Sequence, residues 1–329
     1  MKTMQAVVLN AYNTPLAVTT LERPVAGRGQ VLVRIAASGV NPLDVKIAAG
    51  GAAHAQTRLP AVLGVDMAGI VEAVGEDVDG FLPGDAVYGM TGGIGGVQGS
   101  LAQFAAVDAR LLAHKPNNLS MREAAALPLI FITAWEGIVD RARTGAGMKV
   151  LVHGGAGGVG HIAVQLALAL GAEVHATGEA SQRATIEGFG ATFIDYRAST
   201  VDDYVARLTK GEGYDVVYDT VGGATLDASF RAARLYGGHV VSCLGWGTHA
   251  LAPLSFRAAT YSGVFTMLPL LSGHGRDKHG AILREAATLV EAGKIRVLMD
   301  EARYTLDTVG AAHQALSTGS ARGKVVVEI

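Results

Sequence analysis

The sequence predicts an α/β protein with a doubly wound parallel sheet, preceded by a β-rich domain. Three observations lead to this fold class. Five glycines stand in the seven positions 154–160, between a short apolar run and a run with helical spacing. Strand-like and helix-like segments then alternate up to about residue 265. The first 124 residues instead contain short apolar or alternating runs, separated by Gly, Pro and Asn.

The N-terminal 124 residues are predicted to form a compact β domain, with expected strands at "QAVVLN", "QVLVRIAAS", "AGIVEAVG" and "DAVYGM". Helical periodicity begins near Ser120, which has the spacing of a capping box with Glu123. We place domain boundaries after residues 124 and 265, so that residues 266–329 contain a helix, "AILREAATLVEAGK", and a closing strand, "GKVVVEI". The glycine-rich loop "TGGIGGVQGS" is expected to be a mobile lid or a plain connector, since no helix follows it closely.

The glycine loop is predicted to bind a dinucleotide. Gly155, Gly157 and Gly160 match the G-x-G-x-x-G pattern, in which glycines permit a tight turn, close approach of a pyrophosphate and close helix–strand contact. A helix N-terminus there supplies unpaired N–H groups and a partial positive charge. A chance pattern in a chain with 44 glycines is the alternative. The strand-like run "AEVHAT" follows at the right distance and favours a Rossmann-type nucleotide site.

The end of that second strand predicts which nucleotide is bound. NAD-binding relatives of this fold carry an acid about 20 residues after the loop, to accept the ribose hydroxyls. Thr177 and Gly178 stand at that place, while Ser181 and Arg183 just beyond are able to bind a 2′-phosphate. NADPH is therefore favoured. Glu179 disagrees with this, and Arg183 has the alternative interpretation of a solvated charge on a helix face.

Composition excludes several classes of protein. A chain of 329 residues suggests about two domains, and its formal net charge of −2, with no basic block, argues against nucleic acid or an anionic membrane as partner. No long apolar run and no signal-peptide layout is present, so a cytoplasmic location is expected. The single cysteine, Cys243, excludes an internal disulfide and a multi-cysteine zinc site.

Almost the whole chain resembles the medium-chain dehydrogenase/reductase superfamily, specifically its zinc-independent quinone oxidoreductases of the zeta-crystallin-like group. The resemblance rests on "SGVNPLDVKIAAG", "LPAVLGVDMAGIVEAVGEDVDGFLPGDAVYG", "LAHKPNNLSMREAAALPLIFITAWEGI", "VLVHGGAGGVG", "YDVVYDTVGG" and "ARGKVVVEI". It implies a GroES-like β-barrel catalytic domain, built from residues 1–124 and 266–329, into which an NADP-binding Rossmann domain, residues 125–265, is inserted.

The resemblance also bears on zinc. Alcohol dehydrogenases of the superfamily hold a catalytic Zn²⁺ through Cys, His and a further Cys or acid. At the first Cys position this sequence has Asn41, at the His position it has Val65, and Asp66 stands at the acid position. Because an amide and a valine do not make a workable zinc site, no catalytic metal is expected. Scattered histidines such as His153 and His54 are interpreted as packing or surface residues.

Three residues are candidates for the catalytic site. By resemblance, Asn41 and Asp44 border the nicotinamide; their alternative role is turn formation beside Pro42. Lys46 stands where quinone reductases of the group often carry Tyr, and it is able to donate to a substrate oxygen or to bring positive charge near the cofactor. Tyr196 matches the family's tyrosine near the adenosine phosphate, with a plain strand-end aromatic as the alternative, and the resemblance implies that Lys324 lies in a tail that approaches the cofactor. The candidate cofactor-binding residues are Thr133, Gly155, Gly157, Gly158, Val159, Gly160, Thr177, Gly178, Ser181, Arg183, Tyr196, Leu244 and Lys324.

The function expected from these residues is a zinc-independent transfer of hydride from NADPH to a quinone. Reduction of activated alkenes, such as 2-alkenals and enones, is the alternative within the enzyme class. A non-catalytic NADPH-binding protein is the alternative from another class. The resemblance further implies a homodimer formed by pairing of edge strands, for which Gly263 to Leu268 is the candidate edge, unless that run is an internal strand or a buried connector.

Overall fold

The computed structural model describes residues 2–329, which form two compact units. The first unit contains the described residues up to Leu129 together with Met267–Gly293 and Val297–Ile329. The second unit contains Ile130–Thr266 and a short return of the chain, Lys294–Arg296. The second unit is therefore inserted into the first, and the chain crosses to it a second time only for the three residues Lys294–Arg296.

A six-stranded parallel sheet forms the centre of the second unit, in the order β11-β10-β9-β12-β13-β14. The strands are β9 (Lys149–His153), β10 (Glu173–Gly178), β11 (Thr192–Asp195), β12 (Val216–Asp219), β13 (His239–Ser242) and β14 (Thr260–Gly263). The chain winds outward from β9 in both directions, which confirms the predicted doubly wound sheet. The residues of its central strands β9 and β12 are nearly all buried, as expected for a parallel sheet covered on both faces.

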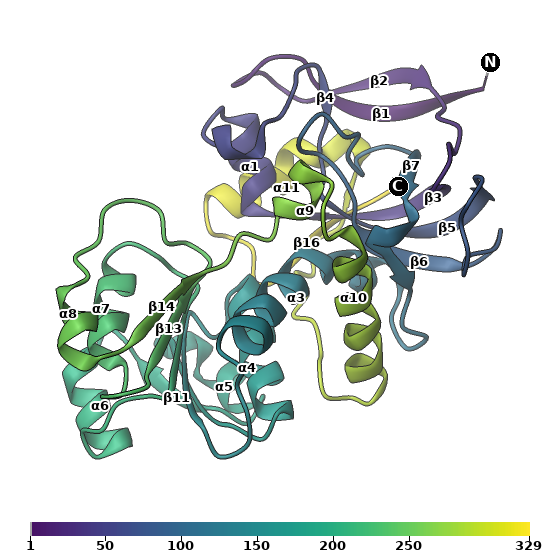
Figure 1. The fold of residues 1–329 in the computed structure, drawn as a ribbon. Helices are drawn as coiled ribbons and strands as arrows, with labels where there is room; N and C mark the ends of the chain where they lie inside the picture. Colours follow the sequence, from purple (N-terminus) through teal and green to yellow (C-terminus); the bar gives the residue numbers. More distant parts are fainter. Residues whose placement is uncertain (1) are drawn as a thin grey trace. The chain divides into compact units, whose positions relative to one another are not determined.

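Helices cover both faces of this sheet (Figure 1). Phe230 packs with Leu151 and Val217 in the core beneath one helical layer. The helices of the second unit are α3 (Pro128–Trp135, of which Pro128 and Leu129 belong to the first unit) with its π-helical continuation Glu136–Arg141, α4 (Gly158–Ala169), α5 (Arg183–Glu187), α6 (Val201–Thr209), α7 (Ala224–Ala232) and α8 (Ala252–Arg257).

The first unit is built mainly on antiparallel strands, and β15 pairs in parallel with β16. Its larger sheet has the order β15-β16-β3-β5-β6-β8, with β7 also paired to β3, and a smaller sheet has the order β2-β1-β4. The strands are β1 (Thr3–Leu9), β2 (Ala17–Glu22), β3 (Gln30–Val40), β4 (Ala61–Val62), β5 (Asp66–Val74), β6 (Ala86–Met90), β7 (Phe104–Asp108), β8 (Leu112–His114), β15 (Tyr304–Thr305) and β16 (Val325–Glu328). The C-terminal β16, yellow in Figure 1, lies beside the purple β3, because Val325 pairs with Val40.

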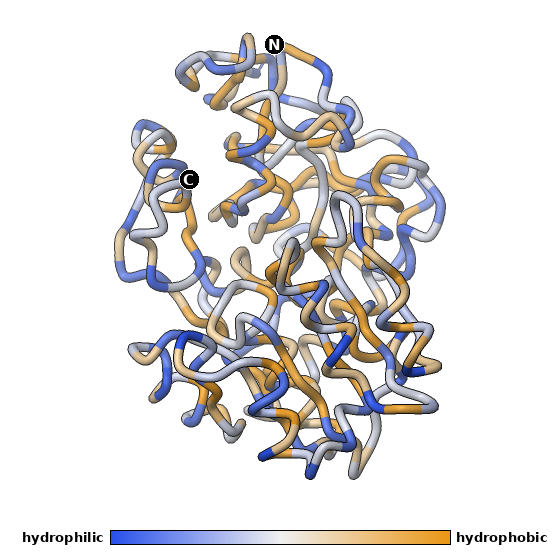
Figure 2. The backbone as a smooth tube through the Cα atoms, turned by 90° about the vertical axis from the view of Figure 1, so that its left-hand side faces the viewer, coloured by the Kyte–Doolittle hydropathy of each residue, from blue (hydrophilic) through white to orange (hydrophobic). Residues whose placement is uncertain are grey.

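Helices α1 (Pro42–Ala48), α2 (Met121–Ala126), α9 (Leu268–Ser272), α10 (Arg276–Glu291) and α11 (Val309–Ser317) complete the first unit. The predicted capping box is confirmed, since the Glu123 N–H donates to Ser120 Oγ at 3.2 Å and the Ser120 N–H donates to Glu123 Oε2 at 2.8 Å. Figure 2 shows hydrophobic segments running through the interior of each unit and hydrophilic ones in outer turns. None of the helices within residues 2–329 is both long and apolar enough to cross a bilayer.

The loop Thr91 to Ser100 is a packed connector. Its ends bind the chain around β4, through a 2.7 Å hydrogen bond from Thr91 N to the Val65 carbonyl and one of 2.9 Å from Gly99 N to the Val62 carbonyl. A Cβ atom on Gly92 would lie 1.9 Å from the Gln98 carbonyl oxygen, so the loop closes on itself only because it has glycine there.

The predicted edge strand from Gly263 to Leu268 is wrong. The strand at that edge of the sheet is β14, Thr260–Gly263, and the chain leaves the sheet after one more hydrogen bond, from Val264 N to the Ser242 carbonyl. Val264 and Met267 are then buried, and Leu268 begins α9. The apolar run is therefore a buried connector, which explains its hydrophobicity without an exposed edge.

Candidate active site

The glycine loop joins β9 to α4 and is fastened to the neighbouring strand. Gly154 N donates to Thr177 Oγ1 at 3.1 Å, and Gly155 N donates to the Thr177 carbonyl at 2.8 Å. Thr177, 3% exposed at the end of β10, thus uses its side chain and its backbone to shape the loop. The Thr177 side chain therefore has a structural role in the loop in addition to the predicted one.

The glycines of the loop differ in what they make room for. A Cβ atom on Gly160 would lie 2.0 Å from the Gly154 carbonyl oxygen, and one on Gly155 would lie 2.6 Å from Ala176 Cβ. On Gly157 the nearest atom would be 3.1 Å away, whereas on Gly158 it would be 3.7 Å away. Gly155 and Gly160 therefore allow close packing of strand, loop and helix. Gly157 is the N-cap of α4, so the N–H groups of the first turn have no acceptor within the helix.

Two arginines and two acidic residues lie together after β10 and β11. Arg197 Nη2 lies 2.5 Å from Glu179 Oε1, which also accepts a 3.1 Å hydrogen bond from the Tyr196 hydroxyl. Arg183 bonds to Glu187 at 3.1 Å, and its guanidinium lies 4.4 Å from the centre of the Phe193 ring. Glu179, the residue that disagreed with NADPH, is thus paired with a cation that the sequence analysis missed.

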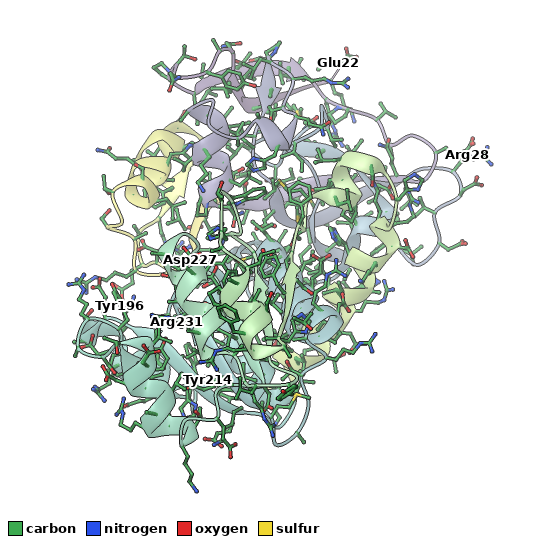
Figure 3. The ribbon with its side chains drawn as sticks, turned by 60° about the vertical axis from the view of Figure 1, so that its left-hand side comes forward. Glu22, Arg28, Tyr196, Tyr214, Asp227 and Arg231 are labelled. Carbon is green, nitrogen blue, oxygen red and sulfur yellow. The ribbon has the colours of Figure 1, made fainter. Side chains whose placement is uncertain are left out.

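Arg197 carried a usable signal, because it directly follows Tyr196 after the predicted third strand, and carboxyl ends of neighbouring parallel strands lie side by side. Tyr196 is half exposed on the outer surface of the second unit (Figure 3). Ser181 lies in a 3-10 turn, Ala180–Gln182, between β10 and α5. The structure therefore places Ser181, Arg183 and Tyr196 around the same strand ends.

Thr133 and Leu244 also belong to the second unit. Thr133 is buried on α3, with its Oγ1 atom 3.0 Å from Thr266 Oγ1 and its carbonyl accepting a 2.7 Å hydrogen bond from Tyr218. Leu244 follows the carboxyl end of β13, and its N–H donates to Ser242 Oγ at 3.0 Å. Both residues are held in defined positions, and their predicted contacts with a cofactor stay predictions.

A buried polar cluster of Asn41, Asp44, Asp66 and Lys324 lies in the first unit, and no member is more than 5% exposed. Lys324 Nζ donates to Asn41 Oδ1 at 2.5 Å, and Asn41 Nδ2 donates to Asp66 Oδ2 at 2.9 Å. The other Asp66 oxygen accepts from Leu129 N at 2.9 Å. Asp44 accepts from the backbone N–H of Asn41 at 2.8 Å and caps α1. The amide of Asn41 therefore bridges a cation and a carboxyl group.

Burial dominates the ionisation of this cluster. Desolvation raises the pKa of Asp44 to about 6 and the pKa of Asp66 to about 7, while the charge of Lys324 opposes both shifts. Desolvation lowers the pKa of Lys324, and the two aspartates oppose that shift. Lys46, in contrast, is exposed on α1. The structure thus brings together Asn41, Asp44 and Lys324 but leaves Lys46 outside their cluster.

The residues at the positions of the zinc ligands do not fit zinc. Both oxygens of Asp66 already accept hydrogen bonds, and the Asn41 oxygen binds an ammonium group, which repels a metal cation. Across residues 2–329 no three or more His, Cys, Asp or Glu side chains are grouped so that they could hold a metal.

His153 and Cys243 belong to the second unit, where burial lowers the pKa of His153 to about 4 and raises that of Cys243 to about 12.

Comparison with protein families gives two matches. Residues 27–117 match the family described as "Alcohol dehydrogenase GroES-like domain", and residues 189–327 match the one described as "Zinc-binding dehydrogenase". The first match covers most strands of the first unit. The second extends from β11 to β16 and so includes Lys324 but none of the positions 41, 65 and 66.

Among curated proteins, the chain is 36% identical over 308 residues to the 2-methylene-furan-3-one reductase of Solanum lycopersicum, covering 91% of this chain and 71% of that protein. It is 34% identical over 306 residues to the chloroplastic NADPH-dependent alkenal/one oxidoreductase of Arabidopsis thaliana, covering 91% and 72%. The second of these relatives, which aligns along nearly the whole chain, is thus NADPH-dependent.

Two solved structures resemble the chain along almost its whole length. An alcohol dehydrogenase superfamily protein from Novosphingobium aromaticivorans is 54% identical, with a TM-score of 0.97 and 99% of both chains covered. The quinone oxidoreductase from Coxiella burnetii is 28% identical, with a TM-score of 0.84 and 100% of both chains covered. The chain therefore belongs to the medium-chain dehydrogenase/reductase superfamily, as an NAD(P)H-dependent oxidoreductase with a GroES-like unit and a Rossmann-type unit.

Proposed function

We propose that this protein is a zinc-independent, NADPH-dependent reductase of electron-poor conjugated carbonyl compounds. The first substrate class is the activated alkenes, that is 2-alkenals and enones, and quinones are the second. The observation that carries the proposal is the Lys324–Asn41–Asp66 cluster, because its donor set offers no site for a Lewis acid. An acceptor that needs no metal must already be polarised by conjugation.

Similarity supports this order of substrates. The relatives that reduce a methylene-furanone or alkenals and enones are 36% and 34% identical, whereas the quinone oxidoreductase is 28% identical. Both reactions have the same balance: a hydride from NADPH and a proton from solvent or protein reduce the acceptor by two electrons. With an enone, hydride adds to the β-carbon and the proton to the α-carbon. With a quinone, the product is a hydroquinone.

The preference for NADPH is supported by the strand ends of the second unit. No acidic side chain stands at Thr177 or Gly178, and in this proposal Arg183 and Arg197, which follow β10 and β11, counter the charge of a 2′-phosphate. The carboxylate of Glu179 is paired with the guanidinium of Arg197, which offsets its negative charge. In this proposal the first turn of α4 binds the pyrophosphate, and Thr133 contacts the nicotinamide, as the family resemblance implies.

Bound NADPH would supply the hydride. Asn41 and Asp44 are buried and bound by protein groups, so in this proposal they position α1 instead of contacting substrate. Lys46 is the exposed cation on that helix and is proposed to donate to the carbonyl oxygen of the acceptor as negative charge develops on it. An exposed lysine without a fixed partner would act mainly on selection among acceptors.

The test is a panel of initial rates of NADPH oxidation with the full chain. The acceptors are a short 2-alkenal, a 2-enone, 1,4-benzoquinone and 9,10-phenanthrenequinone, and a primary alcohol with NADP⁺ is the control in the reverse direction. We expect the largest kcat/KM with the alkenal or enone and measurable rates with quinones. Fast alcohol oxidation without reduction of any conjugated acceptor would contradict the proposal. NADPH binding without turnover of any acceptor would instead favour a non-catalytic NADPH-binding protein.

A further inference from the structure

We propose that Lys324 is a built-in cation that takes the place of a metal ion at the ligand positions of this superfamily, holding Asn41 and Asp66 in one amide-bridged ion pair. This inference concerns the first unit alone. It does not depend on which acceptor the enzyme reduces. It goes beyond the lack of zinc ligands, because it assigns the positive charge of the site to a particular side chain.

Strand pairing determines the order of the three residues. In the larger sheet β3 lies between β16 and β5, with Val40 opposite Val325 and Gly39 opposite Asp66. The end of β3 therefore brings Asn41 between the residue that precedes β16, Lys324, and the residue that begins β5, Asp66. A Cβ atom on Gly39 would lie 3.0 Å from Asp66 Cβ and 2.2 Å from the Ala125 carbonyl oxygen, so close approach here requires glycine.

Hydrogen bonds give the Asn41 amide a single orientation. Its oxygen accepts from the Lys324 ammonium at 2.5 Å, and its nitrogen donates to Asp66 at 2.9 Å. Reversing the amide would place an N–H group against an ammonium and an oxygen against a carboxylate. Lys324 also donates to the Val40 carbonyl at 3.2 Å. The ammonium thus binds two oxygens of the segment that leads into α1, which makes Lys324 a positioning residue for that helix.

Charge balance supports the same assignment. The charged groups that act on the pKa of Lys324 are Asp66 and Asp44, and Lys324 in turn lowers the pKa of both carboxyl groups. Other helices packed on these strands bring no competing cation: on α2 Arg122 binds the carbonyls of Asp300 and Ala302. On α11, which packs against α1 and β16, burial lowers the pKa of His313 to about 4. Lys324 is therefore the cation whose charge acts on both buried carboxyl groups.

The first experiment compares Lys324→Met, Asp66→Asn and the double variant with the unmodified protein, by thermal unfolding of the full chain at pH 6 and pH 8. Lys324→Met leaves Asp66 without its cation, so its pKa rises further and the carboxylate form is penalised more strongly at pH 8. We expect the unfolding midpoint of Lys324→Met to fall by about 10 °C at pH 8 and by less at pH 6. Asp66→Asn added to Lys324→Met should recover at least half of the loss at pH 8.

Equal losses at both pH values, with no recovery in the double variant, would overturn the proposal, since they are what a simple packing defect produces. If Lys324→Met does not fold, recovery of folding in the double variant still supports the charge-pair assignment, and failure of both contradicts it. The second measurement is elemental analysis of the unmodified protein after incubation with Zn²⁺ and gel filtration. We expect less than about 0.1 zinc per chain, because the ammonium repels a metal at this place. Stoichiometric zinc would overturn the proposal.

Discussion

Replacing Gly160 with alanine tests whether the glycine loop is specified by packing. The added Cβ atom would lie 2.0 Å from the carbonyl oxygen of Gly154, whereas an ordinary contact between these atoms needs more than about 3 Å. Either the loop or the start of α4 must therefore move by about 1 Å. Because the same loop and helix end are proposed to hold the pyrophosphate, this movement should change both stability and cofactor binding.

Two opposing effects determine the magnitude. Overpacking a close contact costs about 1–3 kcal/mol, and alanine within a helix gains about 0.5–1 kcal/mol over glycine. The cost of the close contact is larger than the gain in helix stability, so the free energy of unfolding should decrease by about 1–2 kcal/mol. For a unit of this size that corresponds to a fall in the unfolding midpoint of about 2–8 °C. A comparable loss in binding energy would raise the Kd for NADPH by about tenfold.

Gly158→Ala is the matched control in the same helix turn. Its Cβ atom would meet nothing closer than Ile130 Cγ2 at 3.7 Å, so the fold should tolerate it. Thermal unfolding and fluorescence titration with NADPH measure both variants. We expect Gly160→Ala to lose stability and affinity, and Gly158→Ala to be at least as stable as the unmodified protein. If Gly160→Ala is as stable as Gly158→Ala and binds NADPH normally, the packing argument for this glycine is refuted.

Further predictions concern cofactor, substrate and assembly. Arg183→Glu should raise KM for NADPH much more than for NADH in initial-rate assays with both nucleotides, because it places an acid near the 2′-phosphate; an equal change in both would contradict the proposed site. Lys46→Met should change the ranking of acceptors in the rate panel more than the rate with the best acceptor, and an unchanged ranking would remove Lys46 from the substrate site. Asn41→Ala should lower kcat/KM by about tenfold, because it removes the amide bonds to Lys324 and Asp66 that hold the start of α1, and a loss below twofold would show that α1 keeps its position without the amide. The protein should be a homodimer in multi-angle light scattering at micromolar concentration, with β14 as the candidate edge, and a monomer would remove that expectation.

Several local features followed from the sequence because their signals are short-range. The alternation of strands and helices around the loop 154–160 predicted the doubly wound sheet, and Ser120 with Glu123 predicted a capping box that the structure contains. The glycine spacing predicted a tight strand–loop–helix connection. Gly160 gives the physical reason, because any side chain at position 160 would collide with the carbonyl oxygen of Gly154. In each case the residues involved are near neighbours in the chain, so periodicity and spacing suffice.

One local signal was insufficient. The run Gly263 to Leu268 is apolar and rich in β-forming residues, and it was predicted as an edge strand. Hydrophobicity shows that a segment is buried, but a buried connector and a buried strand have the same composition. Only the pairing of β14 with β13 shows that the strand ends at Gly263 and that Val264 and Met267 enter the core.

Charge partners were decided by tertiary structure alone. Glu179 was interpreted as an obstacle to NADPH until the parallel pairing of β10 and β11 brought Arg197 to it. Lys324 was predicted near a cofactor, which stays a prediction, and the structure adds that it donates to Asn41, 283 residues away, because β16 returns antiparallel to β3. Sequence by itself determined which residues are polar, which are apolar and where the glycines stand. Which buried charge compensates which depends on the register of strands from opposite ends of the chain, and that register exists only once the sheet has formed.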